Sequence, residues 1–203
     1  VTYSFPAGSG DLKAALLDIM DDAKENGIPL YINCILTEGK EQMEDLFPGV
    51  FDFTYDRDTC DYIYSSESLT TLAGKKLHGK RNHINNFKAA HPDWQYEAIT
   101  SDNLKDCWEM NLKWCALYGC SDDEGLKKER CAVENAFAHF EAEGLLGGLL
   151  REETGGPVIA YTMGRPLNSD TFIVHIEKAF HDIQGAYPLI NQQFVEHNCQ
   201  GFT

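Results

Sequence analysis

The chain lacks the short motifs that identify common enzyme classes. It contains no Gly-x-Ser-x-Gly elbow, P-loop, His-Glu-x-x-His helix or EF-hand loop, which argues against the hydrolases, nucleotide-binding proteins and metalloproteins that these motifs mark. Its seven cysteines are irregularly spaced and include no Cys-x-x-Cys pair. The sequence therefore indicates neither a zinc ribbon nor a redox pair, and we expect no metal. Reduced thiols in a cytoplasmic protein are the simplest interpretation.

Long apolar runs and basic residues are also scarce. No apolar run approaches the roughly 18 residues of a membrane-spanning helix, so no membrane span is expected. The chain has 17 Lys and Arg residues against 32 Asp and Glu residues, a net charge of −15. Such an acidic protein does not favour non-specific binding to DNA. Its 203 residues, of which 43% are hydrophobic, suit one large globular domain or two small ones.

The few cations gather in one stretch. Residues 69–91 contain five Lys and Arg side chains and no Asp or Glu, whereas residues 1–68 and residues 92–203 each carry a net charge of −10. Concentrating cations in this way gives no advantage to the fold of an acidic chain, so we interpret the stretch as a local positive field for an anion. The alternative is a solvated surface helix on which charges cluster by chance.

The same stretch has helical periodicity. Leu77, Ile84 and Phe87 share one face of a helix, and Pro92 ends that helix. Charged side chains flank this apolar face, from which long side chains can extend along the edge of the core toward a groove. The candidate ligand-binding residues of this helix are Lys76, Lys80, Arg81, His83 and Asn85.

Two long sequence blocks stand out. The first, KKLHGKRNHINNFKAAHPDWQYE, starts at Lys75, and the second, HIEKAFHDIQGAYPLINQQFVEH, starts at His175. Both resemble the bacterial phosphatidylglycerol lysyltransferase C-terminal-domain-like family, and the resemblance runs from about Tyr3 to the C-terminus. It implies two tandem GNAT-like units (the acyl-CoA N-acyltransferase fold), each an α/β structure with a mixed sheet. It also implies a chain that is clipped at both ends, because family members are usually longer.

Hydrophobic periodicity and turn residues predict the order of the elements. In residues 1–68 they predict a partial first unit with two helices, one beginning near Asp11 and ending at Gly27 and the other beginning at Thr37. Residues 69–93 are expected to form a basic connecting helix. The strands expected in the first unit are residues 1–5, 30–36, 50–55 and 62–64.

The expected second unit, residues 94–203, has the order β-α-α-β-β-β-loop-α. This is the order of a GNAT domain that lacks its final strands. Residues 121–124 suit the acidic first turn of its second helix, and residues 186–197 are its last helix, with Pro188 in the first turn. The strands expected in this unit are residues 94–100, 145–151, 157–165 and 171–177.

The resemblance also implies a cofactor-binding turn before the last helix. In GNAT folds the pyrophosphate of coenzyme A contacts backbone N–H groups there, where the helix N-terminus attracts an anion. The corresponding residues make Gly185 and Ala186 candidates for binding coenzyme A or acyl-CoA. Asp182 and Tyr187 depart from the usual pattern, because a carboxylate repels phosphate and a tyrosine crowds its approach. A plain strand-to-helix turn is the alternative.

Acid–base candidates lie on either side of this turn. His175 and Glu177 are two apart on one expected strand and should share a face. With Tyr187 they could serve as general base and general acid for an amine nucleophile. Asn191 falls one helical turn beyond Tyr187 and is a candidate ligand contact. A buried histidine with satisfied hydrogen bonds is the alternative for His175.

Two functions fit these residues. The first is a transferase that moves an acyl group from acyl-CoA or aminoacyl-tRNA to an amine or hydroxyl acceptor. Five cations are few for binding the many phosphates of tRNA, so a small basic groove suits coenzyme A better than tRNA. The second is a non-catalytic module that binds an anionic ligand or RNA.

Overall fold

The computed structural model describes residues 2–120 and 124–202, which form two compact units divided between Tyr62 and Ile63. The expected acidic turn at residues 121–124 lies largely outside the described residues. The division falls before the expected boundary at residue 68, and it places the whole basic stretch in the second unit.

The first unit is built around a strand–helix–strand element. Strands β1 (Thr2–Ser4) and β2 (Tyr31–Asn33) pair in parallel, and helix α1 (Leu12–Glu25) connects them. The Asp11 carboxylate caps α1 by accepting a hydrogen bond from the N–H of Ala14. Helix α2 (Thr37–Leu46) and the short 3₁₀ helix η1 (Arg57–Thr59) follow. Both predicted helices of this unit are therefore confirmed.

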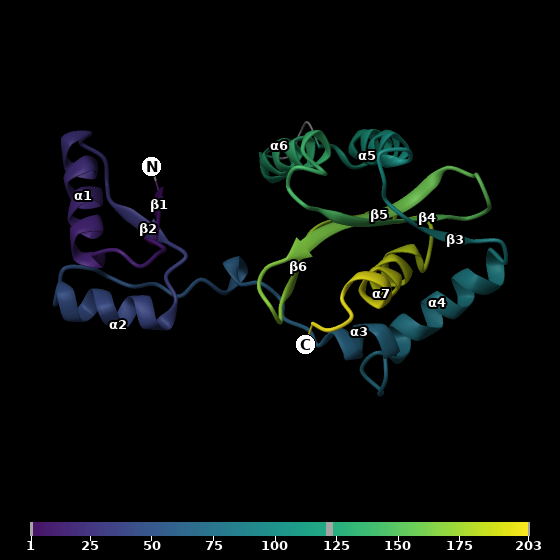
Figure 1. Cartoon of the computed structure of the whole chain (residues 1–203), viewed down its shortest axis with the longest axis horizontal. Coiled ribbons are helices and arrows are strands. Elements are labelled where there is room, and N and C mark those ends of the chain that lie inside the picture. The colour runs from purple at the N-terminus through teal and green to yellow at the C-terminus, as the bar shows by residue number, and fades with distance from the viewer. Residues whose placement is uncertain (1, 121–123, 203) are drawn as a thin grey trace. The chain divides into compact units, whose positions relative to one another are not determined.

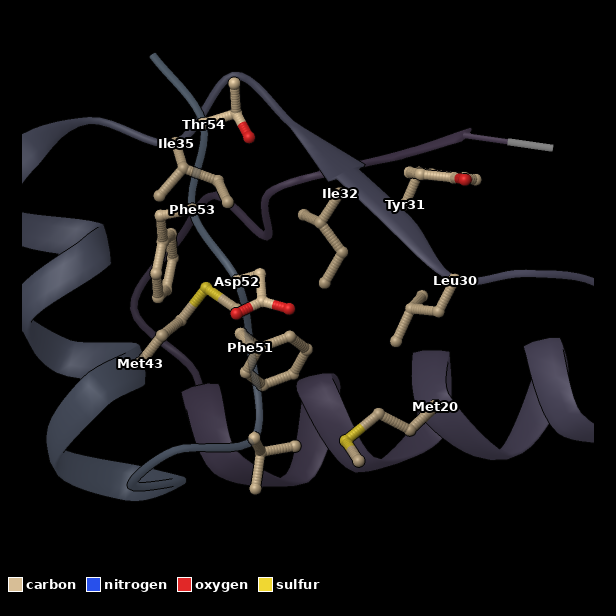
Figure 2. A pocket seen from close by; sticks show the side chains of 11 residues that line it. Met20, Leu30, Tyr31, Ile32, Ile35, Met43, Phe51, Asp52, Phe53 and Thr54 are labelled. Carbon is tan, nitrogen blue, oxygen red and sulfur yellow. The ribbon is translucent and has the colours of Figure 1, made fainter.

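An apolar cavity of about 540 Å³ lies within the first unit, and Figure 2 shows its lining. Met20 from α1 and Met43 from α2 lie around it with Ile32 from β2. The predicted strands at residues 50–55 and 62–64 are wrong, because neither segment forms a strand within residues 2–120 and 124–202. Instead, the aromatic rings of residues 47, 51 and 53 pack on one another along the first of these segments.

The second unit contains a four-stranded antiparallel sheet in the order β3-β4-β5-β6. Each of its strands lies close to the residues predicted from the sequence. Helix α3 (Ser66–Thr71), which follows the N-cap Ser65, was not predicted. The remaining elements are α4 (His78–Ala90), β3 (Gln95–Ala98), α5 (Leu104–Tyr118), α6 (Glu124–Ala138), β4 (Leu146–Arg151), β5 (Val158–Pro166), β6 (Phe172–Ala179) and α7 (Ala186–Asn198).

Helices cover both faces of this sheet (Figure 1). Helices α5 and α6 lie on one face, where Trp114 and Val133 belong to one buried cluster with Tyr161 of β5. Helix α7 lies on the other face, with α3 and α4 beside it. Because both faces are covered, β5 is buried along most of its length and its sequence is an almost continuous apolar run.

Helix α4, expected to connect two units, instead packs within the second. Ile84 and Phe87 on its apolar face are 4% and 2% exposed and pack in one cluster with Leu189 and Ile190 of α7. This confirms the predicted apolar face of the basic helix. The packing of this face on α7 also places Lys80 and His83 of α4 beside α7.

Two findings concern the membrane-spanning helix and the disulfide bonds, neither of which was expected from the sequence. No helix in the described part of the chain is long and apolar enough to cross a membrane. The expectation that all cysteines are reduced is wrong, because Cys115 and Cys120 form a disulfide. Gly119 between them ends α5 in the left-handed conformation with φ 75°, and this turn brings the two Cα atoms to 4.9 Å, within disulfide range.

Candidate functional site

A cavity of about 430 Å³ lies in the second unit among α4, β6 and α7. Five of the residues predicted from the sequence line it, and they come from segments far apart in the chain. These five are Lys80, His83, Glu177, Tyr187 and Asn191. Tyr64, Leu69 and Pro188 complete the lining. The cavity therefore combines two cationic or titratable nitrogen groups, one carboxylate and two aromatic rings.

Glu177 is the carboxylate that lines this cavity. Its Oε2 atom accepts hydrogen bonds from Thr162 Oγ1 and Asn191 Nδ2, each at 3.1 Å. Burial raises the pKa of the Glu177 carboxyl, while the two hydrogen bonds and the charge of Lys80 act in the opposite direction. A carboxylate whose pKa moves toward neutrality, fixed by two donors and open to a cavity, is suited to exchange protons with a ligand.

Tyr187 stands in the first turn of α7 and lines the same cavity. Burial raises the pKa of its phenol, the backbone of Ala179 partly offsets this rise, and the charge of Glu177 adds to it. Its hydroxyl therefore stays protonated near neutral pH and can donate a hydrogen bond. Lys80 contributes the positive charge, with its Nζ atom 6.0 Å from the centre of the Tyr64 ring.

Arg81 does not reach the cavity. Its Nη1 atom donates hydrogen bonds to the carbonyl oxygens of Leu72 and Gly74, the latter at 2.9 Å. Leu72 ends α3 in the left-handed conformation with φ 49°, which turns its carbonyl toward the helix that follows. In this structure Arg81 links the end of α3 to α4, and its predicted role in ligand binding stays a prediction.

Gly185 and Ala186 are buried rather than open to a ligand. Gly185 has a φ of 95°, and a Cβ atom there would lie 2.4 Å from the carbonyl oxygen of His83. Glycine is thus required where α7 meets α4. Asp182, earlier in the same turn, is exposed. The turn lies close to the cavity through Tyr187, but its glycine contacts a helix where the prediction placed a pyrophosphate.

His175 is separated from Glu177. The register of β5 and β6 shifts between Met163 and Gly164, which pair with Ile176 and Val174, so His175 is the extra residue of a bulge. The expected alternation that would place it on the face of Glu177 is therefore wrong. His175 is largely exposed, and its partial desolvation together with the charge of Arg165 lowers its pKa.

Two further predicted residues, Lys76 and Asn85, are exposed and do not line the cavity.

Two residues that shape the cavity were not predicted from the sequence. Thr162 is fully buried and holds Glu177; its signal was a hydroxyl in the middle of an apolar strand. Tyr64 lines the cavity just before α3, but its alternation with Tyr62 was read as a strand.

Comparison with protein families decides the relationship of the chain. The family described as "Phosphatidylglycerol lysyltransferase, C-terminal" matches residues 1–203. The chain belongs to this family. The resemblance carried by the basic block and by the block around Glu177 is thereby confirmed over the whole chain. None of the curated proteins matches this member of the phosphatidylglycerol lysyltransferase C-terminal family.

A solved structure is similar to this family member throughout. It is the crystal structure of a protein of unknown function from Bacteroides thetaiotaomicron, with 40% sequence identity and a TM-score of 0.88. The match covers 97% of the present chain and 66% of the other. The chain thus spans just under two thirds of the length of that protein, and the similarity supports the mixed α/β architecture described above.

Proposed function

We propose that the second unit is a GNAT-like transferase that moves an aminoacyl or acyl group onto an amine or hydroxyl acceptor. The observation that carries this proposal is the Glu177 carboxylate, fixed by Thr162 and Asn191 in a cavity that also contains Lys80 and Tyr187. Membership of the phosphatidylglycerol lysyltransferase C-terminal family supports the reaction class. The element order β-α-α-β-β-β-α supports the GNAT-like scaffold.

Each polar group of the cavity has a role in such a transfer. The acceptor nitrogen or oxygen attacks the carbonyl carbon of the donor ester or thioester, and Glu177 takes the proton that the acceptor loses. The negative charge that develops on the carbonyl oxygen is stabilised by the Lys80 ammonium. When the carbon–oxygen or carbon–sulfur bond to the leaving group breaks, Tyr187 donates a proton to that group. Proton transfer through water returns both side chains to their starting states.

The choice of donor follows from the turn before α7. Gly185 is packed against the backbone of α4, and the exposed Asp182 repels phosphate. Both features weigh against coenzyme A bound at this turn through its pyrophosphate. The family name refers to a lysyltransferase, which favours an aminoacyl group carried as an ester on tRNA. We therefore rank aminoacyl-tRNA above acyl-CoA as the donor.

The same two features favour a second candidate function. A unit in which the turn before α7 is filled by packing against α4 could bind an anion or RNA through Lys80 and His83 without catalysing a reaction. This binding module would retain the cavity but would have no need of a carboxylate held by two donors. The transferase thus needs the Glu177 carboxylate for turnover, whereas the binding module does not need it.

The experiment compares wild-type protein with Glu177→Gln. Lysyl-tRNA, other aminoacyl-tRNAs and acyl-CoA are offered as donors with a panel of amines and alcohols. We expect turnover with an aminoacyl-tRNA, and a loss of roughly 10²–10⁴-fold in the variant with donor affinity retained, the range for removal of a general base. Glu109→Gln on the exposed surface is the matched control and should leave turnover unchanged. Donor binding without turnover in the wild type would establish the binding module instead.

A further inference from the structure

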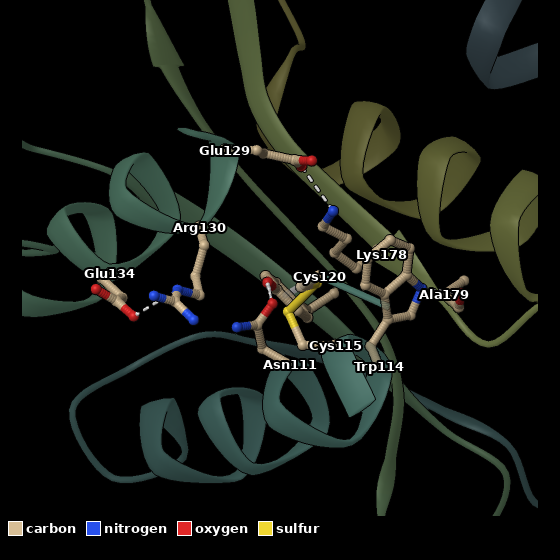
Figure 3. The surroundings of a disulfide bond; sticks show 10 residues. Asn111, Trp114, Cys115, Cys120, Glu129, Arg130, Glu134, Lys178 and Ala179 are labelled. Carbon is tan, nitrogen blue, oxygen red and sulfur yellow. Dashed lines mark hydrogen bonds and ion pairs between the residues drawn. A yellow bond between two sulfur atoms is a disulfide. The ribbon is translucent and has the colours of Figure 1, made fainter. Parts of the chain in front are cut away.

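The disulfide Cys115–Cys120 closes the C-terminal end of α5 (Figure 3). Two backbone hydrogen bonds span the same residues, because the N–H groups of Gly119 and Cys120 both donate to the carbonyl of Cys115, at 3.1 and 3.2 Å. The backbone turn therefore has support of its own, and opening the disulfide would loosen this end of α5 without removing its cap. Cys115 is partly exposed, whereas Cys120 is buried.

Tyr118, the last residue of α5, lies inside this closed loop and contacts the turn before α7. Its hydroxyl oxygen accepts a hydrogen bond from the backbone N–H of His181 at 2.9 Å. Its ring also stacks on the imidazole of His181, with ring centres 4.3 Å apart and planes 30° apart. Tyr118 thus holds His181 by both backbone and side chain, across 63 residues of sequence.

His181 in turn lies beside the candidate acid of the cavity. Its ring centre is 5.8 Å from that of Tyr187. A second connection runs through Trp114, one turn earlier on α5, whose Nε1 atom donates to the carbonyl of Ala179 at 3.0 Å (Figure 3). Ala179 ends the strand that carries Glu177. The C-terminal part of α5 therefore contacts the end of β6 and the turn before α7, two of the segments that lead to polar groups of the cavity, although no residue of α5 lines it.

We propose that Tyr118 is a positioning residue for Tyr187, acting through His181, and that the Cys115–Cys120 disulfide holds Tyr118 in place. The geometry of the cavity then depends on the redox state of a bond outside it. The effect on catalysis rests on the transferase function proposed above, whereas the effect on the position of Tyr187 does not.

The redox step needs a dithiol as its co-reactant. One thiolate of the dithiol attacks the more exposed sulfur, that of Cys115, and the sulfur–sulfur bond breaks to leave a mixed disulfide and the Cys120 thiolate, which takes a proton. The second thiol of the reductant then displaces the Cys115 sulfur. Two electrons and two protons pass to the protein, which gains two thiols, while the dithiol becomes a disulfide.

The primary test follows Tyr187 itself. 3-Fluorotyrosine is placed at position 187, and its ¹⁹F resonance is recorded in the oxidised protein and after reduction with dithiothreitol. Mass spectrometry after thiol alkylation confirms the state of Cys115 and Cys120. We expect the resonance to shift on reduction, and we expect Cys120→Ser to show the reduced spectrum with or without dithiothreitol. Free thiols at both positions in the untreated protein, or an unmoved resonance after reduction, would overturn the proposal.

Matched controls separate positioning from general loosening. Cys131→Ser removes an exposed free cysteine of α6 and should leave the response to reduction intact. 3-Fluorotyrosine at Tyr96, which stacks on His197, should not respond. Tyr118→Phe keeps the ring stack and loses the hydrogen-bond acceptor, so its shift should be smaller than that of Tyr118→Leu, which loses both contacts. Equal shifts at positions 187 and 96 would mean general loosening and would contradict the positioning role.

Activity is a separate readout. With the donor that the wild type turns over, reduction or Tyr118→Leu should lower kcat by about 10–100-fold, the scale of a small misplacement of a reacting group, with KM little changed. A shift at position 187 in a protein that turns over no donor would retain the positioning role and refute the transferase. Turnover that does not depend on redox state, together with a static resonance, would retain the transferase and refute the positioning role.

Discussion

At the scale of single residues, Glu177 is a carboxylate whose surroundings oppose its charge. Burial raises the pKa of its carboxyl above the ordinary range, and the two hydrogen bonds and the charge of Lys80 offset only part of this rise. The folded state thus binds the proton of Glu177 more tightly than the unfolded state does. As the pH increases past the ordinary carboxyl pKa of about 4.3, the unfolded state loses that proton first, and the free energy of unfolding falls.

This gives a pH-dependent prediction for Glu177→Gln. The glutamine Oε1 atom can accept the same two hydrogen bonds as the glutamate Oε2, but it carries no charge. The variant should therefore have the same melting temperature as the wild type near pH 3 and a higher one at pH 7. Thermal unfolding across this range measures the difference, with Glu109→Gln as the exposed control. A lower melting temperature of Glu177→Gln at pH 7 would show that the two hydrogen bonds and the charge of Lys80 outweigh the burial of the Glu177 charge.

Arg81 and Lys80 are adjacent cations with different surroundings. Because the Arg81 guanidinium donates to the carbonyl oxygens of Leu72 and Gly74, Arg81→Lys should lower stability by about 1–3 kcal/mol through lost charge-assisted hydrogen bonds. Donor affinity should not change. Urea unfolding and donor binding are measured on the same variant, and Arg130→Lys, whose exposed partner is Glu134, serves as the control. Weaker donor binding at unchanged stability would return Arg81 to the ligand site.

At the scale of elements, local sequence signals predicted the second unit well. Apolar periodicity marks its long helices and Gly119, of positive φ, marks the end of α5, because these features act within a few residues. The strands at residues 50–55 and 62–64 were wrong because a strand also needs a pairing partner, which an alternating pattern does not supply. The disulfide depended likewise on a turn geometry that cysteine spacing alone does not reveal.

The candidate site shows the same limit. Helical periodicity placed both Lys80 and Arg81 beside the apolar face of the helix. The Arg81 side chain points to the Leu72 carbonyl and not to the cavity, and periodicity does not reveal the position of that carbonyl. A bulge, invisible to a two-residue period, moved His175. Gly185 had the sequence signature of a glycine before a helix, which fits close packing and anion binding equally. Residues within one element were thus predictable, and the contacts between elements were not.

The close contact of α4 and α7 yields a prediction for Gly185→Ala. An added methyl group would meet the His83 carbonyl and Phe87 Cβ, at 2.4 and 2.8 Å, and the φ of 95° is unfavourable for alanine. Gly201 provides the control, because its φ is 96° and nothing lies within 4 Å of an added Cβ. Gly201→Ala should lose about 1 kcal/mol from backbone strain. Gly185→Ala should lose roughly 1–3 kcal/mol more from overpacking, as measured by urea unfolding. Equal losses would contradict the packing role.

At the scale of the whole molecule, the basic stretch is a local exception to a chain with a net charge of −15. Electrostatic fields are screened within about 8 Å at physiological salt, so a bound polyanion would interact with the nearby lysines and be only weakly repelled by the rest. Two of the five cations already have partners within the protein and are less available to a polyanion. Arg81 contacts backbone carbonyls, and Lys88 lies over the Trp94 ring at 4.9 Å. Lys75, Lys76 and Lys80 are exposed.

If tRNA carries the donor group, as proposed, these three lysines limit the salt dependence of its binding. Each phosphate neutralised contributes about −0.7 to −0.9 to the slope of the logarithm of the association constant against the logarithm of salt concentration. Three lysines therefore predict a slope of about −2 to −3, shallow for an RNA-binding protein. Titrations of uncharged tRNA over a salt series measure it. Replacing both Lys75 and Lys76 by Gln should reduce the magnitude of the slope by about 1–2. Replacing the exposed Lys105 of α5 by Gln should leave the slope unchanged. A wild-type slope of −5 or steeper would mean that tRNA contacts cations beyond this stretch, and the basic stretch would then not be the main contact for the donor.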